Sequence, residues 1–468
     1  MQNNNKLVSI LTVISFLGLS LPLPAAADAD LTADNVLSMA EAVGGWLAKQ
    51  PIVDARGTSW PDDALNPEQV GYDLASGTAG KVVYFSALYR ATGNDDYRDL
   101  ALGGAEYLLS VINDPVAFEG NPRRASLYSG IAGVGVALQE AIGLSVEPKY
   151  NKGLDRVTGL LEEWQVAEAS GLRWSDDFND LIYGDAGTAL FLASLAAQRN
   201  DAKLLETASR SAHFLLSQAE ATETGSFWYF RRSKDFNLPN FSHGTAGVSY
   251  VLATVGDYAK DEVLLAGAAA GFEYLRSIAE IEDGILRMPY GWGLDHWDGL
   301  YEFGWAHGLA GDAILFERLQ QVGIRPQLAK TFENLAKNTI LNIGLPGSPD
   351  APFAEPSTPL DWRFGRAGTL LVLSRWDDAP EELTVVRNTI WQHIAAAATR
   401  DGHGVHWEVD APAFMGGGRA AYTGLFHGAA GIGLAALYLH AGMTGHDPYI
   451  RLPDDAHAAG SIQDSYTP

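Results

Sequence analysis

One tetrapeptide, Gly-x-Ala-Gly, recurs along this chain of 468 residues and constrains its fold more than any other feature. Successive first glycines are 53, 54, 60, 64, 57 and 63 residues apart, enough chain for two helices and their loops. Such a period is the signature of an array of supersecondary units. The seven copies are Gly77–Gly80, Gly130–Gly133, Gly184–Gly187, Gly244–Gly247, Gly308–Gly311, Gly365–Gly368 and Gly428–Gly431.

The segments around the tetrapeptides are of two kinds. Those that follow a tetrapeptide, such as 82–88, 188–195 and 432–439, are apolar on all sides, which is typical of a buried helix. Those between them carry charge on one face and apolar residues at helical spacing, as in 96–111, 203–218 and 326–341. Each unit therefore pairs an inner buried helix with an outer amphipathic helix.

Seven such hairpins predict an all-α fold, a double-layered α/α toroid around a central funnel. An open solenoid is the alternative, but it would leave one edge of the apolar inner layer bare. The glycines would permit unusual backbone angles and close helix approach where a loop enters an inner helix. We expect the loops before the tetrapeptides to gather at one mouth. The toroid domain spans 28–450, and 451–468 are expected to be a disordered tail.

The first 27 residues have the pattern of a cleavable signal peptide. Lys6 is followed by an apolar stretch from Leu7 to Leu23, and Ala25, Ala26 and Ala27 suit cleavage before Asp28. A membrane anchor is the alternative, although Pro22 and Pro24 interrupt the end of the stretch. We therefore expect a secreted or periplasmic protein without stable membrane insertion.

Composition removes several classes of function. The net charge of −25 argues against nucleic acid or anionic lipid as partners. Because the chain contains no cysteine, it has no disulfide, no thiolate metal ligand and no cysteine nucleophile.

Three histidines, His243, His307 and His427, each stand directly before the first glycine of a repeat. In a ring they would point to one mouth, close to inner-helix N-termini whose dipoles favour the neutral imidazole. A neutral histidine can act as a general base or bind a metal, and Asp185 follows Gly184 at a similar height. The alternatives are that each histidine simply packs a helix end, or that the three form a metal site.

Arginines and aromatic residues are also expected near the mouth. Arg363, Arg366 and Arg419 could capture a carboxylate, or could pair with nearby acids such as Asp361. Tryptophans there could stack on sugar rings, with carboxylates beside them as acid/base pairs, or could only pack the loops. The tryptophans are Trp292, Trp297, Trp305, Trp362 and Trp407, and the carboxylates are Asp295, Asp298, Glu302 and Glu408.

Glycine repeats open the inner helices, two of them read His-Gly-x-Ala-Gly, and the last reads Phe426-His-Gly-Ala-Ala-Gly. From about Gly71 to Gly442 this pattern resembles the lanthionine synthetase C-like (LanC-like) family. The resemblance implies a double-layered toroid. In typical members, zinc at the mouth activates a peptide thiol, which adds to a dehydroamino acid. The family's Asp-x-x-x-Gly element matches Asp180 to Gly184, and also Asp73 to Gly77.

This chain departs from the family at the zinc site, which the resemblance implies is two cysteines and a histidine. The Trp-Cys-x-Gly motif reads Trp362-Arg363-Phe364-Gly365, and the Cys-His-Gly motif reads Phe426-His427-Gly428. The family's Ala-His-Gly motif, with its proposed acid/base histidine, matches Ala306 to Gly308. A second register, through Ser242-His243-Gly244, loses the thiolate as well. The usual zinc site is therefore expected to be absent, with zinc or another divalent metal left as a minor alternative.

Taken together, the sequence predicts a secreted LanC-like protein that acts on a peptide or small substrate in the funnel without a zinc–thiolate centre. The rival hypotheses are a periplasmic glycosidase or lyase acting on an oligosaccharide, and a non-catalytic binding or scaffold protein. The candidate catalytic residues are His307, His427, Asp180 and His243. The candidate substrate-binding residues are Arg363, Trp305, Trp362, Asp185 and Trp297.

Overall fold

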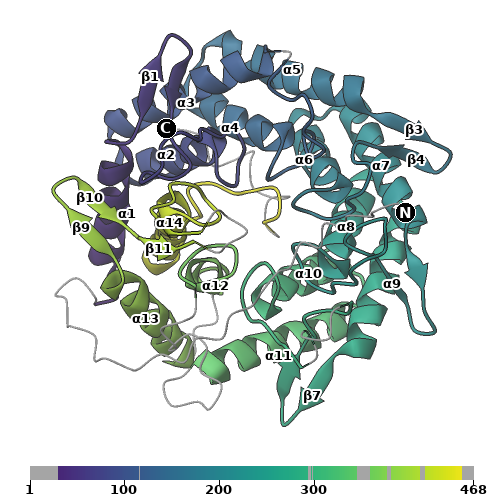
Figure 1. Ribbon diagram of the computed structural model, residues 1–468. Coiled ribbons are helices and arrows are strands. Elements are labelled where there is room, and N and C mark those ends of the chain that lie inside the picture. The colour runs from purple at the N-terminus through teal and green to yellow at the C-terminus, as the bar shows by residue number, and fades with distance from the viewer. Residues whose placement is uncertain are drawn as a thin grey trace, which may run out of the picture.

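The computed structural model describes residues 30–114, 116–293, 297, 299–344, 359–376, 381–411 and 417–455, and its helices form two concentric layers (Figure 1). Every inner helix begins directly after the first glycine of a tetrapeptide. The inner helices are α2 (Thr78–Thr92), α4 (Ile131–Leu144), α6 (Asp185–Arg199), α8 (Thr245–Ala259), α10 (Leu309–Gln321), α12 (Arg366–Leu373) and α14 (Ala429–Thr444). The outer helices are α1 (Ala33–Leu47), α3 (Asp95–Ile112), α5 (Pro148–Trp164), α7 (Ala202–Ser217), α9 (Glu262–Ile278), α11 (Pro326–Gly344) and α13 (Glu381–Ala396).

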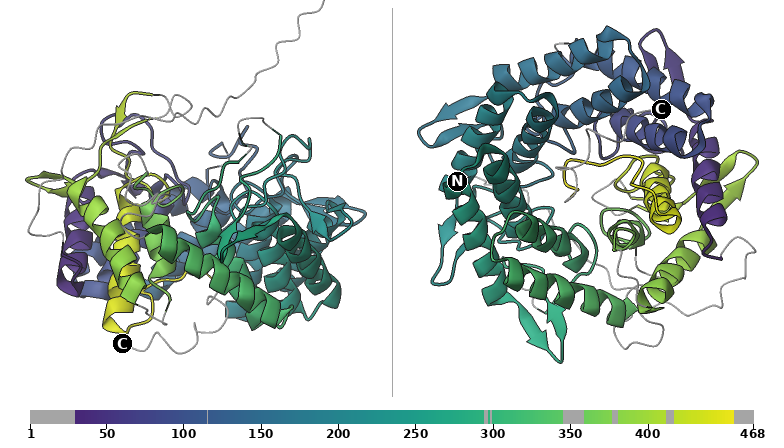
Figure 2. Two further views of the ribbon diagram at one scale, coloured as in Figure 1. Left: turned by 90° about the horizontal axis from the view of Figure 1, so that it is seen from below. Right: turned by 180° about the vertical axis from the view of Figure 1, so that it is seen from behind.

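The inner layer closes on itself. Each inner helix packs against the next around the ring, and α14 packs against α2 to complete it. The first helix, α1, covers α14 from outside, so the first and last helices lie in the same part of the ring (Figure 2). The predicted toroid is confirmed, and the open solenoid is not the fold. No helix in the described ranges has the length and apolar character needed to cross a membrane.

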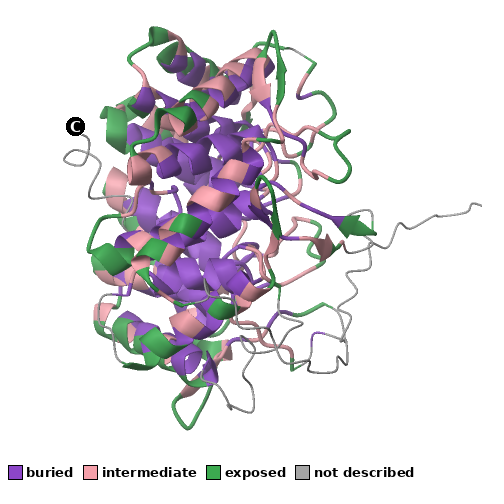
Figure 3. Cartoon of the chain, turned by 90° about the vertical axis from the view of Figure 1, so that its left-hand side faces the viewer, coloured by how far each residue is buried: buried purple, intermediate pink, exposed green. Residues whose placement is uncertain are grey.

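The inner helices are buried on all sides, whereas the outer helices expose one face (Figure 3). In α2 and α8 every residue of the first two turns is buried. In α7 only the positions at helical spacing, such as Ala208, Ala212 and Leu215, are buried. The two kinds of apolar pattern in the sequence therefore correspond to the two layers.

Short β-hairpins project from the rim, in the described ranges, and the sequence analysis did not predict them (Figure 1). They connect an outer helix to the inner helix that follows it. Their strands are β1 (Ile52–Asp54) with β2 (Gly57–Ser59), β3 (Val166–Glu168) with β4 (Gly171–Arg173), β5 (Glu220–Ala221) with β6 (Ser226–Phe227), β7 (Glu280–Glu282) with β8 (Ile285–Arg287), and β9 (Thr399–Asp401) with β10 (Gly404–His406). A further pair, β11 (Val409–Asp410) with β12 (Arg419–Ala420), lies before α14.

A tryptophan anchors four of these hairpins to the preceding outer helix. Trp60, Trp174, Trp228 and Trp407 each follow the second strand, and each indole N–H donates to a helix carbonyl 13 residues earlier, at 2.7 to 2.9 Å. All four end a Gly-x-x-Trp motif. Four of the 12 tryptophans in this chain therefore hold hairpins to the outer layer.

Replacing Trp228 with phenylalanine is expected to destabilise the fold by about 1–3 kcal/mol, because a smaller ring fills the buried site and the indole N–H bond to the Leu215 carbonyl is lost, which leaves that carbonyl only the Gln218 N–H as a donor. Urea unfolding followed by circular dichroism measures the change. Trp292→Phe is the control, since that side chain is 39% exposed, and it should change the free energy of unfolding by no more than about 0.5 kcal/mol. Equal effects of the two substitutions would contradict the anchoring role.

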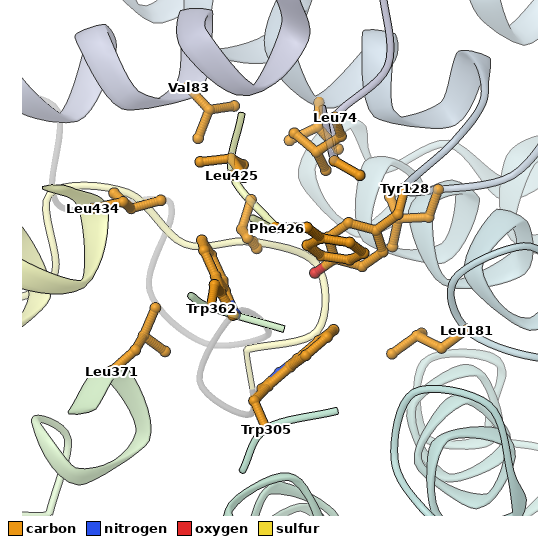
Figure 4. Packing of buried hydrophobic residues seen from close by; sticks show 14 of the residues in the cluster. Leu74, Val83, Tyr128, Leu181, Trp305, Trp362, Leu371, Leu425, Phe426 and Leu434 are labelled. Carbon is orange, nitrogen blue, oxygen red and sulfur yellow. The ribbon is translucent and has the colours of Figure 1, made fainter. Parts of the chain in front are cut away.

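The four residues before each tetrapeptide, which we call the entry segment, meet around the ring axis. The backbone N–H of the third residue of one entry segment donates to the carbonyl of the same position in the next. These bonds run from Ala75 to Tyr128 to Ile182, and from Ser242 to Ala306 to Arg363 to Phe426 and back to Ala75, at 2.9 to 3.3 Å. The side chains of Tyr128, Trp305, Trp362 and Phe426 pack in the centre of this circle (Figure 4).

The glycines are needed for this close approach and not for their backbone angles. The first glycines have negative φ, for example −124° at Gly428, so the unusual angles that we expected are not present. The second glycine of each tetrapeptide lies against a carbonyl of its own entry segment. A Cβ on Gly431 would lie 1.8 Å from the Leu425 oxygen, and one on Gly368 would lie 1.9 Å from the Trp362 oxygen.

The C-terminal segment 450–455 enters the ring and bridges distant repeats (Figure 2). Tyr128 donates to Asp454 at 2.9 Å, the Tyr250 hydroxyl donates to the Asp455 carbonyl at 3.1 Å, and Arg375 pairs with Asp455 at 3.0 Å. We expected a disordered tail from 451, but residues 452–455 are buried. This short segment has no clear apolar pattern, because two of its buried residues are aspartates. The predicted signal peptide and the rest of the tail lie outside the described residues.

Candidate functional site

The three histidines occupy the last position of their entry segments and lie along one arc of the mouth. The rings of His243 and His307 are 5.5 Å apart, measured between centroids. Phe364 lies between the other two, 5.2 Å from His307 and 5.8 Å from His427. The ring thus brings together residues that are far apart in the sequence, as the repeat pattern predicted.

Two of these histidines pair with an aspartate from the preceding repeat. Asp180 Oδ2 lies 2.6 Å from His243 Nδ1, and Asp361 Oδ2 lies 2.9 Å from His427 Nδ1. Each aspartate is the first residue of its own entry segment, where it also accepts a backbone N–H from Tyr183 or Phe364. One carboxylate therefore holds the turn of its own entry segment and orients the histidine of the next repeat.

His243 has both ring nitrogens occupied. Arg363 Nη2 lies 2.8 Å from Nε2, and because a guanidinium only donates, Nε2 accepts and the imidazole proton is on Nδ1, facing Asp180. Burial, together with Arg363 and Arg123, lowers the pKa of His243 well below its usual value. Burial raises the pKa of Asp180 to about 7. His243 therefore positions Arg363 and has no free ring nitrogen for proton transfer.

His427 has the geometry of a general base. Its Nδ1 faces Asp361, and Nε2 has no hydrogen-bond partner among the described residues. The side chain is 14% exposed, so a substrate in the mouth can reach it. A carboxylate behind the imidazole fixes the tautomer and stabilises the cation that forms when Nε2 takes a proton.

Glu302 is close enough to Asp361 for the charge of that carboxylate to act on it. It lies two residues before the fifth entry segment and is half-buried. Burial, and then the negative charge of Asp361, raise its pKa to about 7, so an appreciable fraction is protonated at neutral pH. A protonated acid beside a histidine base is the pairing that general acid–base catalysis requires.

His307 is in a different environment from the other two histidines. It is 9% exposed, and neither ring nitrogen has a partner in the described part of the chain. Tyr290 and Phe364 contact the ring edge to face, and burial lowers the pKa of His307 well below its usual value. Asn240 stands where the other pairs have aspartate, and its Oδ1 already accepts from Ser242 and from the backbone N–H of His243.

The predicted substrate-binding residues other than Arg363 are placed in the interior. Asp185 accepts two backbone N–H groups and pairs with Arg232. Trp305 and Trp362 belong to the aromatic centre of the ring, and Trp297 packs on Tyr290 and Phe236. Of the other candidates, Arg366 is buried, Arg419 pairs with Glu408 on the surface, and Asp295 and Asp298 lie outside the described residues.

The residues at the family's zinc positions do not fit a zinc ion. Arg363 places a guanidinium there that is hydrogen-bonded to His243, and Phe426 stacks on Tyr128 with ring centroids 4.6 Å apart. Only His427 could donate to a metal there, whereas zinc requires three or four such ligands. Over the described ranges, no three His, Asp or Glu side chains are grouped as a metal site.

Comparisons with known proteins identify the class. A family profile described as lanthionine synthetase C-like protein matches residues 68–350, which is more than half of the chain, so this protein belongs to that family. The match ends before the sixth and seventh repeats, where the zinc positions fall. A search of curated proteins finds no match.

Solved structures are similar to this chain at low sequence identity, and nisin cyclase shares its fold. Nisin cyclase is 14% identical with a TM-score of 0.55, over 82% of this chain and 91% of that chain. A D-mannose isomerase is 14% identical with a TM-score of 0.45, over 68% and 87% of the two chains. The GH76A α-1,6-mannanase of Salegentibacter sp. HEL1_6 is 16% identical with a TM-score of 0.43, over 77% and 99%.

Sequence reasoning did not find two residues of the mouth. Arg123 stacks on Tyr183, with its guanidinium carbon 3.9 Å from the ring centroid, and Tyr290 contacts His307. Both precede their entry segments by several residues, so the tetrapeptide pattern does not point to them. Arg123 lies three residues before its entry segment, so a search of the residues just upstream of every entry segment could have found it, whereas Tyr290 lies 14 residues before Gly304 and carries no such signal.

Proposed function

We propose that this protein is an exported LanC-like enzyme that acts on a peptide or small substrate at the mouth of the funnel by acid–base catalysis. The observation that carries the proposal is the Asp361–His427 pair, at 2.9 Å, and it is supported by the effect of Asp361 on the pKa of Glu302. Nothing in this arrangement depends on a thiolate. His427 Nε2 would remove a proton from the substrate, Asp361 would hold the imidazole, and Glu302 would return a proton to the leaving or receiving atom.

The test is turnover measured by mass spectrometry after incubation of the mature protein with a panel of substrates. The panel contains peptides with dehydroalanine or dehydrobutyrine plus a thiol or amine, and neutral and acidic oligosaccharides. Products should form with the native protein, also after treatment with a chelator. His427→Gln should lower kcat about 100- to 10,000-fold. No turnover of any panel member, or full activity of His427→Gln, would overturn the proposal.

A matched control exists on the outer layer. His213, on α7, pairs with Asp261 at 2.7 Å, far along the chain from any entry segment, and His213→Gln should leave kcat unchanged. The pH profile gives a second readout. Because Glu302 acts in its protonated form, activity should fall as the pH rises through about 7. Glu302→Gln should lose most of the activity, and the activity that remains should no longer fall over this pH range.

A glycosidase or lyase activity is the second candidate. The observation in its favour is the nearness of two carboxyl groups, Glu302 and Asp361, the first with its pKa raised to about 7. The oligosaccharides in the panel decide between the candidates. Cleaved oligosaccharides without any modified peptide would select the glycosidase or lyase.

We also propose that the protein is secreted or periplasmic after removal of residues 1–27. The positive, apolar and small-residue regions before Asp28 support this. N-terminal sequencing of the protein from the producing cells should begin at Asp28, and an intact Met1 would contradict it.

A further inference from the structure

Two arginines flank a single aromatic ring at the mouth. The guanidinium carbon of Arg123 lies 3.9 Å from the Tyr183 ring centroid, and that of Arg363 lies 6.0 Å from the same centroid. They come from the loop before α4 and from the sixth entry segment, so only closure of the ring brings them together. Arg363 also stacks on Phe364 at 4.6 Å.

Neither Arg123 nor Arg363 forms an ion pair with an acid among the described residues. In the parts of the chain that the structure describes, no carboxylate oxygen lies within 4.0 Å of Arg123 or Arg363, although acids outnumber bases by 57 to 32. Other arginines, such as Arg90 with Glu140, are paired. Asp361, two residues from Arg363, is already engaged by the Phe364 N–H and by His427.

The guanidinium of Arg363 is held in place but not satisfied. Asp180 fixes His243, and His243 Nε2 accepts from Arg363 Nη2, which leaves the rest of the fork for another acceptor. Arg363 Nε is buried without a hydrogen-bond partner. A buried donor without a partner is costly and rare in a folded protein, and it indicates a missing acceptor.

A third group beside the arginines also lacks a partner. His307 is about nine-tenths buried, both its nitrogens are unpartnered, and its ring is 5.5 Å from His243 and 5.2 Å from Phe364. An imidazole in this position can donate one neutral N–H. The mouth therefore offers two cations and a neutral donor, and within the described chain Arg363 Nε and both nitrogens of His307 have no hydrogen-bond partner.

We infer that the mouth binds a carboxylate of the substrate between Arg123 and Arg363, with His307 as an additional donor, and that this carboxylate places the neighbouring atoms at His427. The inference rests on the proposed function for the position of the reacting atoms, but the binding step is independent of turnover. A carboxylate matches the planar guanidinium fork. It could be the C-terminus of a peptide or the acid group of a uronic acid, since the chemistry is shared.

The experiment is calorimetric titration of His427→Gln, which removes turnover and leaves both arginines. The probes are N-acetyl-dialanine against its C-terminal amide, and glucuronic acid against glucose. At least one acid should bind at least tenfold more tightly than its neutral counterpart, and its dissociation constant should rise with salt. The peptide acid and the sugar acid identify the source of the carboxylate.

Substitutions in the same background locate the site. Arg123→Gln and Arg363→Gln should each weaken binding of the acid about tenfold or more, and the melting temperature reports whether each variant is folded. Arg124→Gln is the matched control, because Arg124 adjoins Arg123 but stacks on Trp164, and it should bind as before. Arg123→Gln keeps the inference testable if Arg363→Gln does not fold.

Three results would overturn the inference. They are equal binding of acids and neutral probes, no binding of either acid, and unchanged binding by folded Arg123→Gln. None of them touches the proposed function, because turnover of a neutral substrate by the native protein would survive each. Conversely, a protein without measurable turnover could still bind the acids through the two arginines.

Discussion

Asp312→Asn should stabilise this protein by roughly 4 kcal/mol at pH 7, since each unit of pKa shift corresponds to about 1.4 kcal/mol. Asp312 lies in the first turn of α10 and is 1% exposed. Its Oδ1 has no partner, and no cation faces it among the described residues. Burial alone raises its pKa from 3.8 to about 8. Asparagine has the same shape and cannot ionise.

The pH dependence makes the sign of this effect testable. The folded pKa of Asp312 is above its unfolded value, so the stability that this group contributes is fully present below pH 3.8 and is lost as the pH rises to about 8. Urea unfolding at several pH values should therefore show a gap between variant and native protein that is near zero at pH 4 and widens to pH 8. Asp155→Asn, at an exposed carboxylate, should show no such widening. A gap that is constant with pH would contradict the assignment.

Arg375→Met should destabilise the fold by about 3–5 kcal/mol, because it leaves the buried carboxylate of Asp455 without its cation. Arg375 also lies over the Tyr438 ring, and Asp454 beside it accepts from Tyr128. Without the pair, segment 450–455 should leave the ring. Limited proteolysis followed by mass spectrometry should then detect new cleavage between 446 and 455, together with a lower free energy of unfolding.

A double substitution separates the pair from its surroundings. Arg375→Met with Asp455→Leu should recover much of the stability, since an apolar pair can replace a buried ion pair at little cost. Arg156→Met, at an exposed pair with Glu163, should cost no more than about 1 kcal/mol. Additive losses from the two single substitutions would show that Arg375 and Asp455 do not act as a pair.

The layers of the fold were predictable from the sequence because each rests on a local pattern. The tetrapeptides gave the start of every inner helix to within a residue, and the amphipathic stretches gave outer helices such as α3 and α7. The rim hairpins were missed because their strands are only two or three residues long. Their signal was present as Gly-x-x-Trp before Trp60, Trp174, Trp228 and Trp407.

The candidate site was predictable in its members but not in its pairings. The repeat placed His243, His307 and His427 together, yet it could not assign their partners, since Asp180 and Asp361 lie 63 and 66 residues before the histidines that they bind. Nor could it show that Arg363 contacts His243. Such contacts depend on side-chain reach between neighbouring repeats, which no local pattern records.

The entry segments occupy equivalent positions around the axis, and backbone hydrogen bonds join each of them to the next except from Ile182 to Ser242. An aspartate at the head of one entry segment and a histidine at the end of the next can therefore form the same pair at any of the seven junctions, and this chain forms it at two of those described. At the junction that follows the first pair, a single asparagine, Asn240, stands in place of the acid. The ring can thus lose an aspartate–histidine pair at one junction and keep it at another, so that point substitutions move such a pair around the axis without altering the architecture.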